Sequence, residues 1–377
     1  MIPYGHQFID QADIDAVVKV LKSDWVTTGP KVAEFEKALC DKVGSKHATV
    51  VNSGTSALDI SVQALGLPPG SEVITTPFTF VATSNAILYN DLKPVFADID
   101  SGTRNIDPES IKKKITKKTK AVIYVDYAGQ PCRIREIREV ADDNDLHLVE
   151  DACHALGAEY RGKRVGAFAD MTVFSFHPVK HITTGEGGAV TTDNENLDRR
   201  LKMLRNHGMS KEAPIGTEPG LDYLYDIKAL CRNYRITDLQ CALGLSQISK
   251  LESFVEKRTQ LADIYNRILG NVKSVEVPKV DKDVKHAWHL YTVLLNGIER
   301  NNFFRYMRAN DVGVQVHYIP IYKFSYYRER FKIEPEEFPV TEDVFERIVT
   351  LPLHPQLGNK DIDFICDKIK SYPGSEP

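Results

Sequence analysis

Over the first 45 residues the apolar positions recur every three to four residues, which is the period of a helix with one buried face. The pattern runs from about residue 10 through Ile14 and Leu21, and breaks at the turn Thr27–Pro30. A second amphipathic stretch follows, with its apolar face made by Val32, Phe35, Leu39 and Val43. We therefore expect two helices before the first strand.

Seven short apolar runs rich in β-branched residues come next, and helical patterns separate most of the first five. The runs are His47–Asn52, Glu72–Thr76, Pro94–Ile99, Ala121–Asp126, His147–Asp151, Met171–Phe176 and Gly188–Thr192. The clearest helical patterns are Ala57–Leu65, Pro108–Ile115 and Ile134–Asp143. Apolar strands that alternate with helices predict a mainly parallel sheet covered on both faces, in a three-layer α/β/α domain. Because the last two runs lie so close together, we expect a tight turn or an antiparallel edge strand there.

The regular alternation of predicted strands and helices ends in the last third of the sequence. A long helical pattern starts at Thr237 and carries the chain through Leu251 and Tyr265. Strand-like runs are fewer beyond it, namely Ser274–Val277, Leu290–Leu295 and Gly313–His317. A chain of 377 residues is long enough for more than one core. We therefore predict a large domain over residues 1–250 and a small α/β domain over residues 251–377.

Composition narrows the class of protein. Hydrophobic residues make up 42% of the chain and charged residues 27%, which is ordinary for a globular protein. The net charge of −4 argues against a general nucleic-acid binder. The first ten residues lack a basic stretch followed by an apolar core, so we expect no signal peptide, and no apolar run is long enough to span a bilayer. Six scattered cysteines without a C-x-x-C pair favour free thiols over disulfides or a zinc site. These features predict a soluble, cytoplasmic protein with no metal and no nucleic-acid or membrane partner.

Sheets of this kind bind ligands beyond the carboxyl ends of their strands, so the loops there are the places to look for chemistry. The first such loop, Asn52–Ala57, consists of small residues and opens a helix. Its backbone N–H groups and the helix dipole suit a phosphate, although Ser and Thr also cap helices that bind nothing. A second loop begins at Asp151, at the end of a strand. A carboxylate there can pair with a pyridinium nitrogen, or it can simply cap the next helix.

Lys180 lies in a third loop, after the apolar run that ends at Phe176 and before the glycine-rich turn Gly185–Gly188. A lysine attacks an aldehyde only after it loses its proton, and burial or nearby cations lower its pKa enough for this. At any single position an exposed surface lysine is the commoner interpretation. The order of the three sites, a phosphate loop, a strand-end Asp151 and then Lys180, favours a pyridoxal-phosphate (PLP) site instead.

These segments resemble the nucleotide-sugar aminotransferases of the fold-type I PLP family, from residue 2 to the segment Leu351–His354. The supporting segments are Ser23–Pro30, Thr76–Thr83, Arg205–Gly208, Asn233–Arg235 and Val316–Tyr318. A finer likeness is to the branch of the family that serves pseudaminic acid synthesis, carried by Val125–Gly129, His154–Gly157 and Gln315–Tyr322. The resemblance implies a seven-stranded large-domain sheet, a small α/β C-terminal domain, PLP as cofactor and a homodimer as the working form.

The resemblance also implies roles for individual residues. Lys180 would bind PLP covalently and serve as the catalytic base and acid, and Asp151 would pair with the pyridine nitrogen. The other implied cofactor contacts are Gly54, Thr55 and Ser175 at the phosphate, Phe80 stacked on the ring, and His154 near the phenolic oxygen.

Asn233 falls where members of the family reach across a dimer interface to the partner's phosphate, so each active site would need two chains. Cys231 and Arg232 precede it, where the family usually has Gly-Tyr, which puts the local loop conformation in question. Positions that contact substrate in the family align with Tyr4, Asp24, Trp25, Val26, Thr27, His317, Tyr318, Ile319 and Pro320. A satisfied core histidine explains His317 equally well.

The reaction that the resemblance implies is a ping-pong transfer. L-Glutamate would load the enzyme with an amino group, which then passes to the 4-keto carbon of a UDP-linked 4-keto-6-deoxy-N-acetylhexosamine. A related enzyme acting on another carbon or another nucleotide sugar would use the same chemistry. A PLP-dependent sugar dehydratase would carry histidine in place of Lys180, so Lys180 speaks against it. A non-catalytic regulator with this fold is the alternative from a different class, and turnover of a keto sugar separates it from an enzyme.

Overall fold

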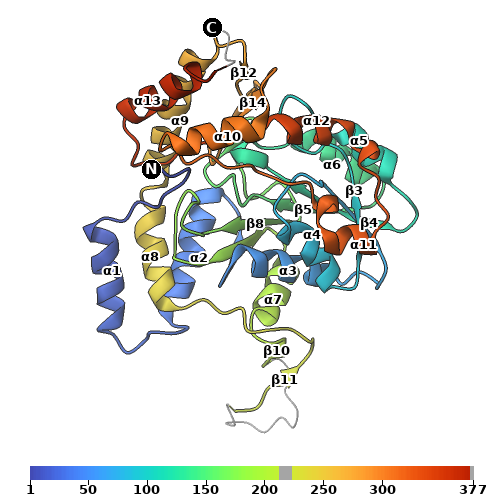
Figure 1. Cartoon of the computed structure of the whole chain (residues 1–377). Coiled ribbons are helices and arrows are strands. Elements are labelled where there is room, and N and C mark those ends of the chain that lie inside the picture. The colour runs from blue at the N-terminus through green and yellow to red at the C-terminus, as the bar shows by residue number, and fades with distance from the viewer. Residues whose placement is uncertain (212–222, 374–377) are drawn as a thin grey trace.

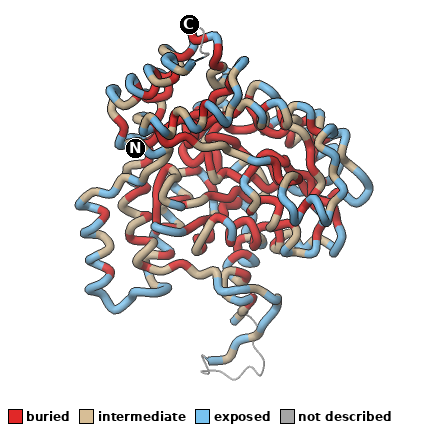
Figure 2. The backbone as a smooth tube through the Cα atoms, viewed as in Figure 1, coloured by how far each residue is buried: buried red, intermediate tan, exposed pale blue. Residues whose placement is uncertain are grey.

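The computed structural model describes residues 1–211 and 223–373. Figure 1 shows a central sheet with helices on both sides, a smaller C-terminal assembly of helices and strands, and a hairpin that projects away from the body. Buried residues follow the sheet and the inner faces of the helices, whereas the hairpin and the outer helix faces are largely exposed (Figure 2). No helix in the described part of the chain has the length and apolar character needed to cross a membrane.

The large sheet has seven strands in the order β1-β9-β8-β5-β4-β2-β3. They are β1 (His47–Val51), β2 (Glu72–Thr75), β3 (Lys93–Phe96), β4 (Thr119–Val125), β5 (His147–Asp151), β8 (Met171–Ser175) and β9 (Gly188–Thr192). Every predicted run overlaps one of these strands. The pairs that link β3, β2, β4, β5 and β8 are parallel, which confirms the predicted mainly parallel sheet.

The position of β9 corrects one expectation. It runs antiparallel, as predicted, but it pairs with both β8 and β1 and therefore lies inside the sheet rather than at its edge. All five of its residues are buried. The outermost strands are β1 and β3, because β1 adds to the far side of β9. No tight turn joins β8 to β9, and the loop between them carries Lys180.

Helices cover both faces of this sheet, and the strands sort their side chains between them. One face is covered by α2 (Pro30–Val43), α6 (Ile134–Asp143) and α8 (Asp238–Ile248), with α1 (Gln11–Leu21) packed on α8 and α5 (Pro108–Lys114) beside α6. The other face is covered by α3 (Gly54–Leu65), α4 (Ala82–Tyr89) and α7 (Glu195–Leu204). Successive residues of β5 show the alternation: Leu148 packs in the first layer and Val149 in the second.

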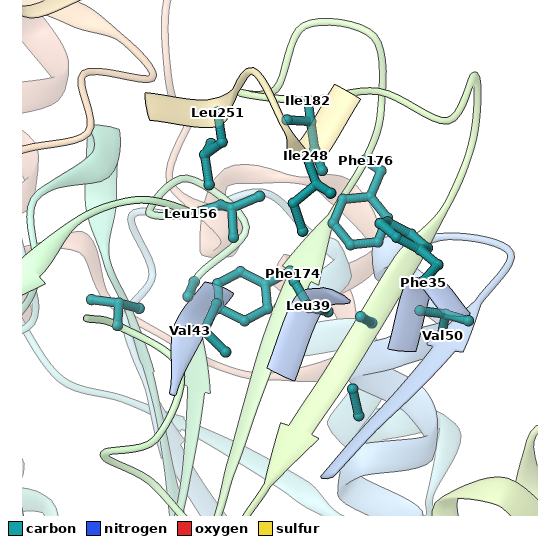
Figure 3. Close-up of a cluster of buried hydrophobic side chains, with 14 of the residues drawn as sticks. Phe35, Leu39, Val43, Val50, Leu156, Phe174, Phe176, Ile182, Ile248 and Leu251 are labelled. Carbon is teal, nitrogen blue, oxygen red and sulfur yellow. The ribbon is translucent and has the colours of Figure 1, made fainter. Parts of the chain in front are cut away.

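Aromatic and aliphatic side chains fill the layer between the sheet and α2. Figure 3 shows Phe35 and Leu39 of α2 near Phe174 and Phe176, which belong to β8 and the loop after it, with Ile248 of α8 beside Phe176. The rings of Phe35 and Phe176 have centroids 5.2 Å apart. This dense layer fixes the start of the loop that carries Lys180.

Local chemistry explains where the main helices begin and end. Asp10 caps α1 and Thr237 caps α8, each in a reciprocal arrangement with the residue three positions on. Ser53 accepts a hydrogen bond from the Ser56 N–H at the start of α3. Gly66 ends α3 in the left-handed conformation, with a φ of 65°.

The C-terminal part is a second, smaller core. Helices α9 (Leu251–Leu269), α10 (Arg300–Ala309) and α13 (Asn359–Lys370) pack on an antiparallel sheet of β12 (Val275–Glu276), β14 (Tyr291–Leu295) and β15 (Ile348–Leu351). The remaining short elements are η1 (Tyr127–Gly129), η2 (Ile321–Lys323), η3 (Pro335–Glu337), α11 (Ser325–Arg330), α12 (Pro339–Arg347), the sheet of β13 (Val284–Lys285), β6 (Glu159–Tyr160) and β7 (Lys163–Arg164), and the hairpin of β10 (Met209–Ser210) and β11 (Asp226–Ile227).

Two expectations for the C-terminal part are wrong. The long helix predicted from Thr237 is two helices, because the chain breaks between Ile248 and Leu251. The run Gly313–His317 is not a strand: its ladder contacts are split between a bridge from Gln315 to Thr350 and a bond from the Gly313 N–H to the Ile2 carbonyl. The third strand is β15, which follows α12 directly without a turn signal.

Candidate active site

A cavity of about 450 Å³ opens beyond the carboxyl ends of β4, β5 and β8. Of the residues that the sequence singles out, it brings together Tyr4, Gly54, Thr55, Phe80, Asp151, His154, Ser175, Lys180, His317 and Tyr318. They come from loops after four strands, from the N-terminus and from the C-terminal part. This is the strand edge where the sequence pattern places the chemistry.

The N-terminus of α3 forms one wall of the cavity. Helix geometry leaves the N–H groups of Gly54 and Thr55 without acceptors inside the helix. A Cβ atom at position 54 would come within 2.9 Å of the Ser175 Cβ, so only glycine lets this turn approach Ser175 so closely. The result is a tight group of backbone N–H and hydroxyl donors, which suits a phosphate.

Asp151 ends β5 and is almost fully buried. Its Oδ2 accepts a hydrogen bond of 2.7 Å from the Thr83 hydroxyl, and its Oδ1 accepts one of 3.2 Å from the Cys153 N–H. Within residues 1–211 and 223–373, no Lys, Arg or His forms an ion pair with it. A buried carboxylate without a cation is costly, so the site fits a ligand that brings a positively charged nitrogen.

Lys180 lies half-buried in the loop after β8, on the same cavity. Burial lowers its pKa, while the charges of Cys153 and Asp151 raise it. In the described structure its ammonium group has no hydrogen bond and no ion pair, so nothing competes with a ligand for it. A lysine with a lowered pKa and a free side chain is suited to attack a carbonyl carbon.

His154 lines the cavity, and both of its ring nitrogens have hydrogen-bond partners within the described part of the chain. Its Nδ1 accepts a hydrogen bond of 3.3 Å from the Ala128 N–H, so Nε2 carries the proton and donates to the Tyr318 hydroxyl at 3.0 Å. Burial and the charge of Lys180 lower the pKa of His154 well below its usual value. Tyr318 also lines the cavity, and its hydroxyl keeps a hydrogen to donate because it accepts from His154. The Phe80 ring lies beside the Tyr318 ring, with centroids 6.2 Å apart.

His317 has features of both a substrate-contacting residue and a core histidine with a satisfied hydrogen bond. It lines the cavity, and its Nδ1 also forms a 2.9 Å hydrogen bond with the Thr350 hydroxyl. Burial and the nearby charge of Lys180 lower its pKa to about 4. It is therefore a neutral imidazole at neutral pH.

Several expected site residues lie outside the cavity. They are Asp24, Trp25, Val26, Thr27, Asn233, Ile319 and Pro320. Trp25 is 56% exposed. Asn233 bridges Asn206 near the projecting hairpin, and its Oδ1 accepts a hydrogen bond from the Arg235 N–H. Within one chain, these residues do not line the cavity that holds Lys180.

Sequence reasoning missed three side chains of the site. Thr83 holds Asp151, and Glu186 and His289 line the cavity. Glu186 lies in the glycine-rich turn that the sequence already marked. His289 directly precedes the predicted strand Leu290–Leu295, at its amino end, and pattern reasoning looks for ligands at the carboxyl ends of strands.

Two buried carboxyl groups, those of Glu150 and Asp126, lie outside the cavity lining. Glu150 and Asp126 are both fully buried. The oxygens Glu150 Oε1 and Asp126 Oδ2 have no N–H or O–H donor among the described residues. Burial raises the pKa of Glu150 to about 7, and burial together with the charge of Glu150 raises the pKa of Asp126 well above its usual value. The two carboxyl groups therefore share a proton at mildly acidic pH.

This pair predicts a pH-dependent stability. Between the usual carboxyl pKa and about 7, the folded protein holds a proton that the unfolded chain has released, so stability falls as pH rises, by about 1.4 kcal/mol per pH unit for one proton. Glu150→Gln keeps an acceptor for the Thr172 hydroxyl and needs no proton. As pH rises from 5 to 7, the melting temperature of Glu150→Gln should therefore rise relative to that of the wild type. Glu139→Gln, on the exposed face of α6, is the control. If the melting temperatures of Glu150→Gln and the wild type change in parallel with pH, the two carboxyl groups do not share a proton.

The comparison with known proteins extends over nearly the whole chain. The model of the DegT/DnrJ/EryC1/StrS aminotransferase family matches residues 7–370. The chain is 43% identical over 373 residues to the uncharacterized protein MJ1066 of Methanocaldococcus jannaschii. The match covers 98% of this chain and 97% of that protein. It is 39% identical over 377 residues to the UDP-4-amino-4,6-dideoxy-N-acetyl-beta-L-altrosamine transaminase of Campylobacter jejuni subsp. jejuni serotype O:23/36, with 98% and 97% covered.

A solved structure gives the same picture in three dimensions. Spr1654 from Streptococcus pneumoniae, in its PMP-form, matches with a TM-score of 0.93 at 30% identity, over 98% of each chain. Its PLP-form matches with a TM-score of 0.91 at 29% identity, again over 98% of each chain. These likenesses confirm the predicted fold-type I architecture, with its seven-stranded sheet and its small C-terminal sheet.

Proposed function

The chain belongs to the DegT/DnrJ/EryC1/StrS aminotransferase family of PLP-dependent sugar aminotransferases, and we propose that it moves an amino group from L-glutamate to the 4-keto carbon of a UDP-linked 4-keto-6-deoxy-N-acetylhexosamine. The observation that carries the proposal is that one cavity holds both Lys180 and Asp151, and that among the described residues Lys180 has no hydrogen-bond or ion-pair partner and Asp151 has no cation beside it. The relative that is 39% identical is named for a product of this chemical class, which supports a step of pseudaminic acid biosynthesis.

The residues of the cavity fit PLP. Gly54, Thr55 and Ser175 offer donors for its phosphate. The negative charge of the Asp151 carboxylate would pair with the positive charge of a protonated pyridine nitrogen. Phe80 and Tyr318 supply aromatic faces beside the ring. When bound, PLP supplies an electron sink that stabilises negative charge on the carbon that loses its proton.

The protein's own groups would hold the cofactor, move the proton and shield the site. Lys180 would bind the carbonyl carbon of the cofactor, and once released it would accept the proton from one carbon and return it to another. Its lowered pKa favours the neutral amine that this work needs. The Tyr318 hydroxyl, oriented by His154, would donate a hydrogen bond from the cavity wall. Val125, Leu58 and Ala82 add apolar side chains to the lining of the same cavity.

We further propose that the working form is a homodimer with shared active sites. Among the described residues that line the cavity, Lys180 is the only Lys or Arg, although PLP and a nucleoside diphosphate together bring several negative charges. Asn233 and the segment 24–27 lie outside the chain's own cavity and are at least partly exposed. They are available to complete the site of a partner, as the family resemblance implies.

Asn233→Ala is then expected to weaken PLP binding about 10- to 100-fold, because a hydrogen bond to a charged phosphate contributes about 1.5–3 kcal/mol. Equilibrium dialysis measures the loss. Mixing this variant with Lys180→Ala at limiting PLP, where subunits exchange, tests whether Asn233 acts across the interface. One site of each heterodimer is then intact, and activity should return to at most half of the wild-type value per heterodimer. If exchange is verified and no activity returns, Asn233 serves its own chain and the shared site is wrong.

A panel of UDP-linked 4-keto sugars, with glutamate as amino donor, tests the substrate. The proposal expects turnover of a 4-keto-6-deoxy-N-acetylhexosamine and formation of the 4-amino sugar. Turnover of a different keto sugar alone would keep the reaction and replace the substrate. A protein that binds PLP yet turns over no keto sugar, at this carbon or another, would favour a regulator over an enzyme.

A further inference from the structure

The side chain of Arg258 on α9 is fully buried and lacks a counter-ion in the part of the chain that the structure describes. One terminal nitrogen, Nη1, donates to the carbonyls of Trp288, His289 and Leu353 at 3.2, 3.3 and 2.9 Å. Its other two nitrogens have no acceptor among the residues that the structure describes. Burial lowers the pKa of Arg258 to about 10. A buried charge without an opposite charge lowers stability, so the contacts it makes need another reason.

Those contacts hold the segment Ala287–His289 against the wall of the cavity. Trp288 has a φ of 54°, a conformation that residues other than glycine rarely adopt. The turn η1 fixes the segment from the other side, because the Ala287 N–H donates to the Gly129 carbonyl at 2.8 Å. His181, next to Lys180, donates from Nε2 to the Ala287 carbonyl at 2.9 Å. The segment is therefore clamped between α9, η1 and the lysine loop.

The clamped segment delivers His289 to the active site. His289 lines the cavity, and its ring lies against that of His154 with centroids 4.3 Å apart. Neither ring nitrogen of His289 has a hydrogen bond in the described structure, and Nδ1 is fully buried. His154 in turn donates to the Tyr318 hydroxyl. A continuous set of contacts thus leads from Arg258 to the hydroxyl group of Tyr318, a residue that lines the cavity.

We propose that Arg258 is a positioning residue for transamination: it fixes the Ala287–His289 segment so that His289 holds His154, and through it the Tyr318 hydroxyl, in place beside Lys180. The inference rests on the proposed role of Lys180, but not on the identity of the sugar. The proposal gives a functional reason for burying the Arg258 charge, which lowers the stability of the folded protein. Burial, followed by the charge of Arg258, also lowers the pKa of His181 well below its usual value, which keeps the lysine loop free of a second cation.

The test uses the PLP-loaded protein, four single variants and the double variant that combines Arg258→Met with His289→Asn. Arg258→Met removes the charge and the donors, Arg258→Lys keeps a charge and donors, and His289→Asn leaves the clamp intact but removes the ring. Arg267→Met, at an exposed position of the same helix, is the matched control. Two quantities are measured: the single-turnover rate with saturating glutamate per bound PLP, and the pH midpoint of the absorbance of bound PLP.

The proposal expects Arg258→Met and His289→Asn each to slow the glutamate half-reaction about tenfold or more and to move the absorbance midpoint by about half a pH unit. The double variant should lose little more than either single one, because both act through the same ring. Arg258→Lys should recover most of the rate, and Arg267→Met should match the wild type.

Three results would overturn it. One is an Arg258→Met protein that melts earlier but keeps the wild-type rate and midpoint per bound PLP, which is the signature of a purely structural role. The second is full additivity of the two substitutions. The third is a wild-type rate and midpoint in His289→Asn, which decides the matter even if Arg258→Met does not fold. A failure of the proposed function appears separately, as borohydride labelling of a lysine other than Lys180 in the wild-type protein.

Discussion

Replacing Lys180 with alanine is expected to lower turnover at least about 10³-fold while the protein keeps its fold, because one side chain both binds the cofactor and transfers the proton. The ammonium group forms no hydrogen bond or ion pair in the described structure, so its removal costs the folded state little. The rate is measured with glutamate and the keto sugar that the substrate panel identifies, and melting temperature reports on the fold.

Two controls make the Lys180 result specific. Lys19→Ala, at an exposed lysine of α1 outside the cavity, should match the wild type. Lys180→Arg keeps a positive charge but not a nucleophilic amine, so it should be nearly as inactive as Lys180→Ala. A Lys180→Ala protein that is folded and retains more than about a tenth of wild-type turnover would remove Lys180 from the chemistry.

Asp151→Asn is expected to retain PLP and lose about 30- to 1,000-fold in turnover. The loss corresponds to about 2–4 kcal/mol of transition-state stabilisation from a charge-assisted pair with the pyridine nitrogen. Asparagine has the same shape and still accepts one of the hydrogen bonds from Thr83 and the Cys153 N–H, so the local structure should survive. Single-turnover kinetics with glutamate measure the effect without the sugar.

Thr83→Val is the matched comparison for Asp151. It removes the 2.7 Å hydrogen bond to Oδ2 but leaves the carboxylate, so its loss should be much smaller, about tenfold or less. Near-normal kinetics in a folded Asp151→Asn protein would reduce Asp151 to a residue that only caps the loop after β5. A larger loss in Thr83→Val than in Asp151→Asn would show that geometry, rather than charge, matters at this position.

The sequence predicts most of the sheet because its strands are apolar on both faces and end at small polar loops. It misplaces β9 because pairing partners are not encoded locally: β1 reaches the far side of β9 from 140 residues earlier in the chain. Gly313–His317 has the composition of a strand, but its partners come from the N-terminus and from β15. Long-range pairing of this kind leaves no periodic signal in either segment.

The site residues likewise fall into those whose positions follow from the sequence pattern and those whose positions depend on long-range contacts. Gly54, Asp151 and Lys180 follow strands in the main sheet, so their convergence follows from the parallel topology. His289 and Arg258 belong to the C-terminal part, and their relation to Lys180 depends on how that part docks on the large sheet. Asn233 and the segment 24–27 lie outside the cavity of a single chain, so neither the sequence pattern nor one folded chain brings them to it.

Borohydride reduction of the purified PLP-loaded protein, followed by peptide mapping, tests the central claim most directly. The reagent fixes PLP to the amine that holds it. The account predicts one labelled peptide, with the modification on Lys180, and loss of that label when glutamate is added before reduction. A label on any other lysine, or a label on Lys180 that glutamate does not remove, would contradict a transaminase that works through Lys180.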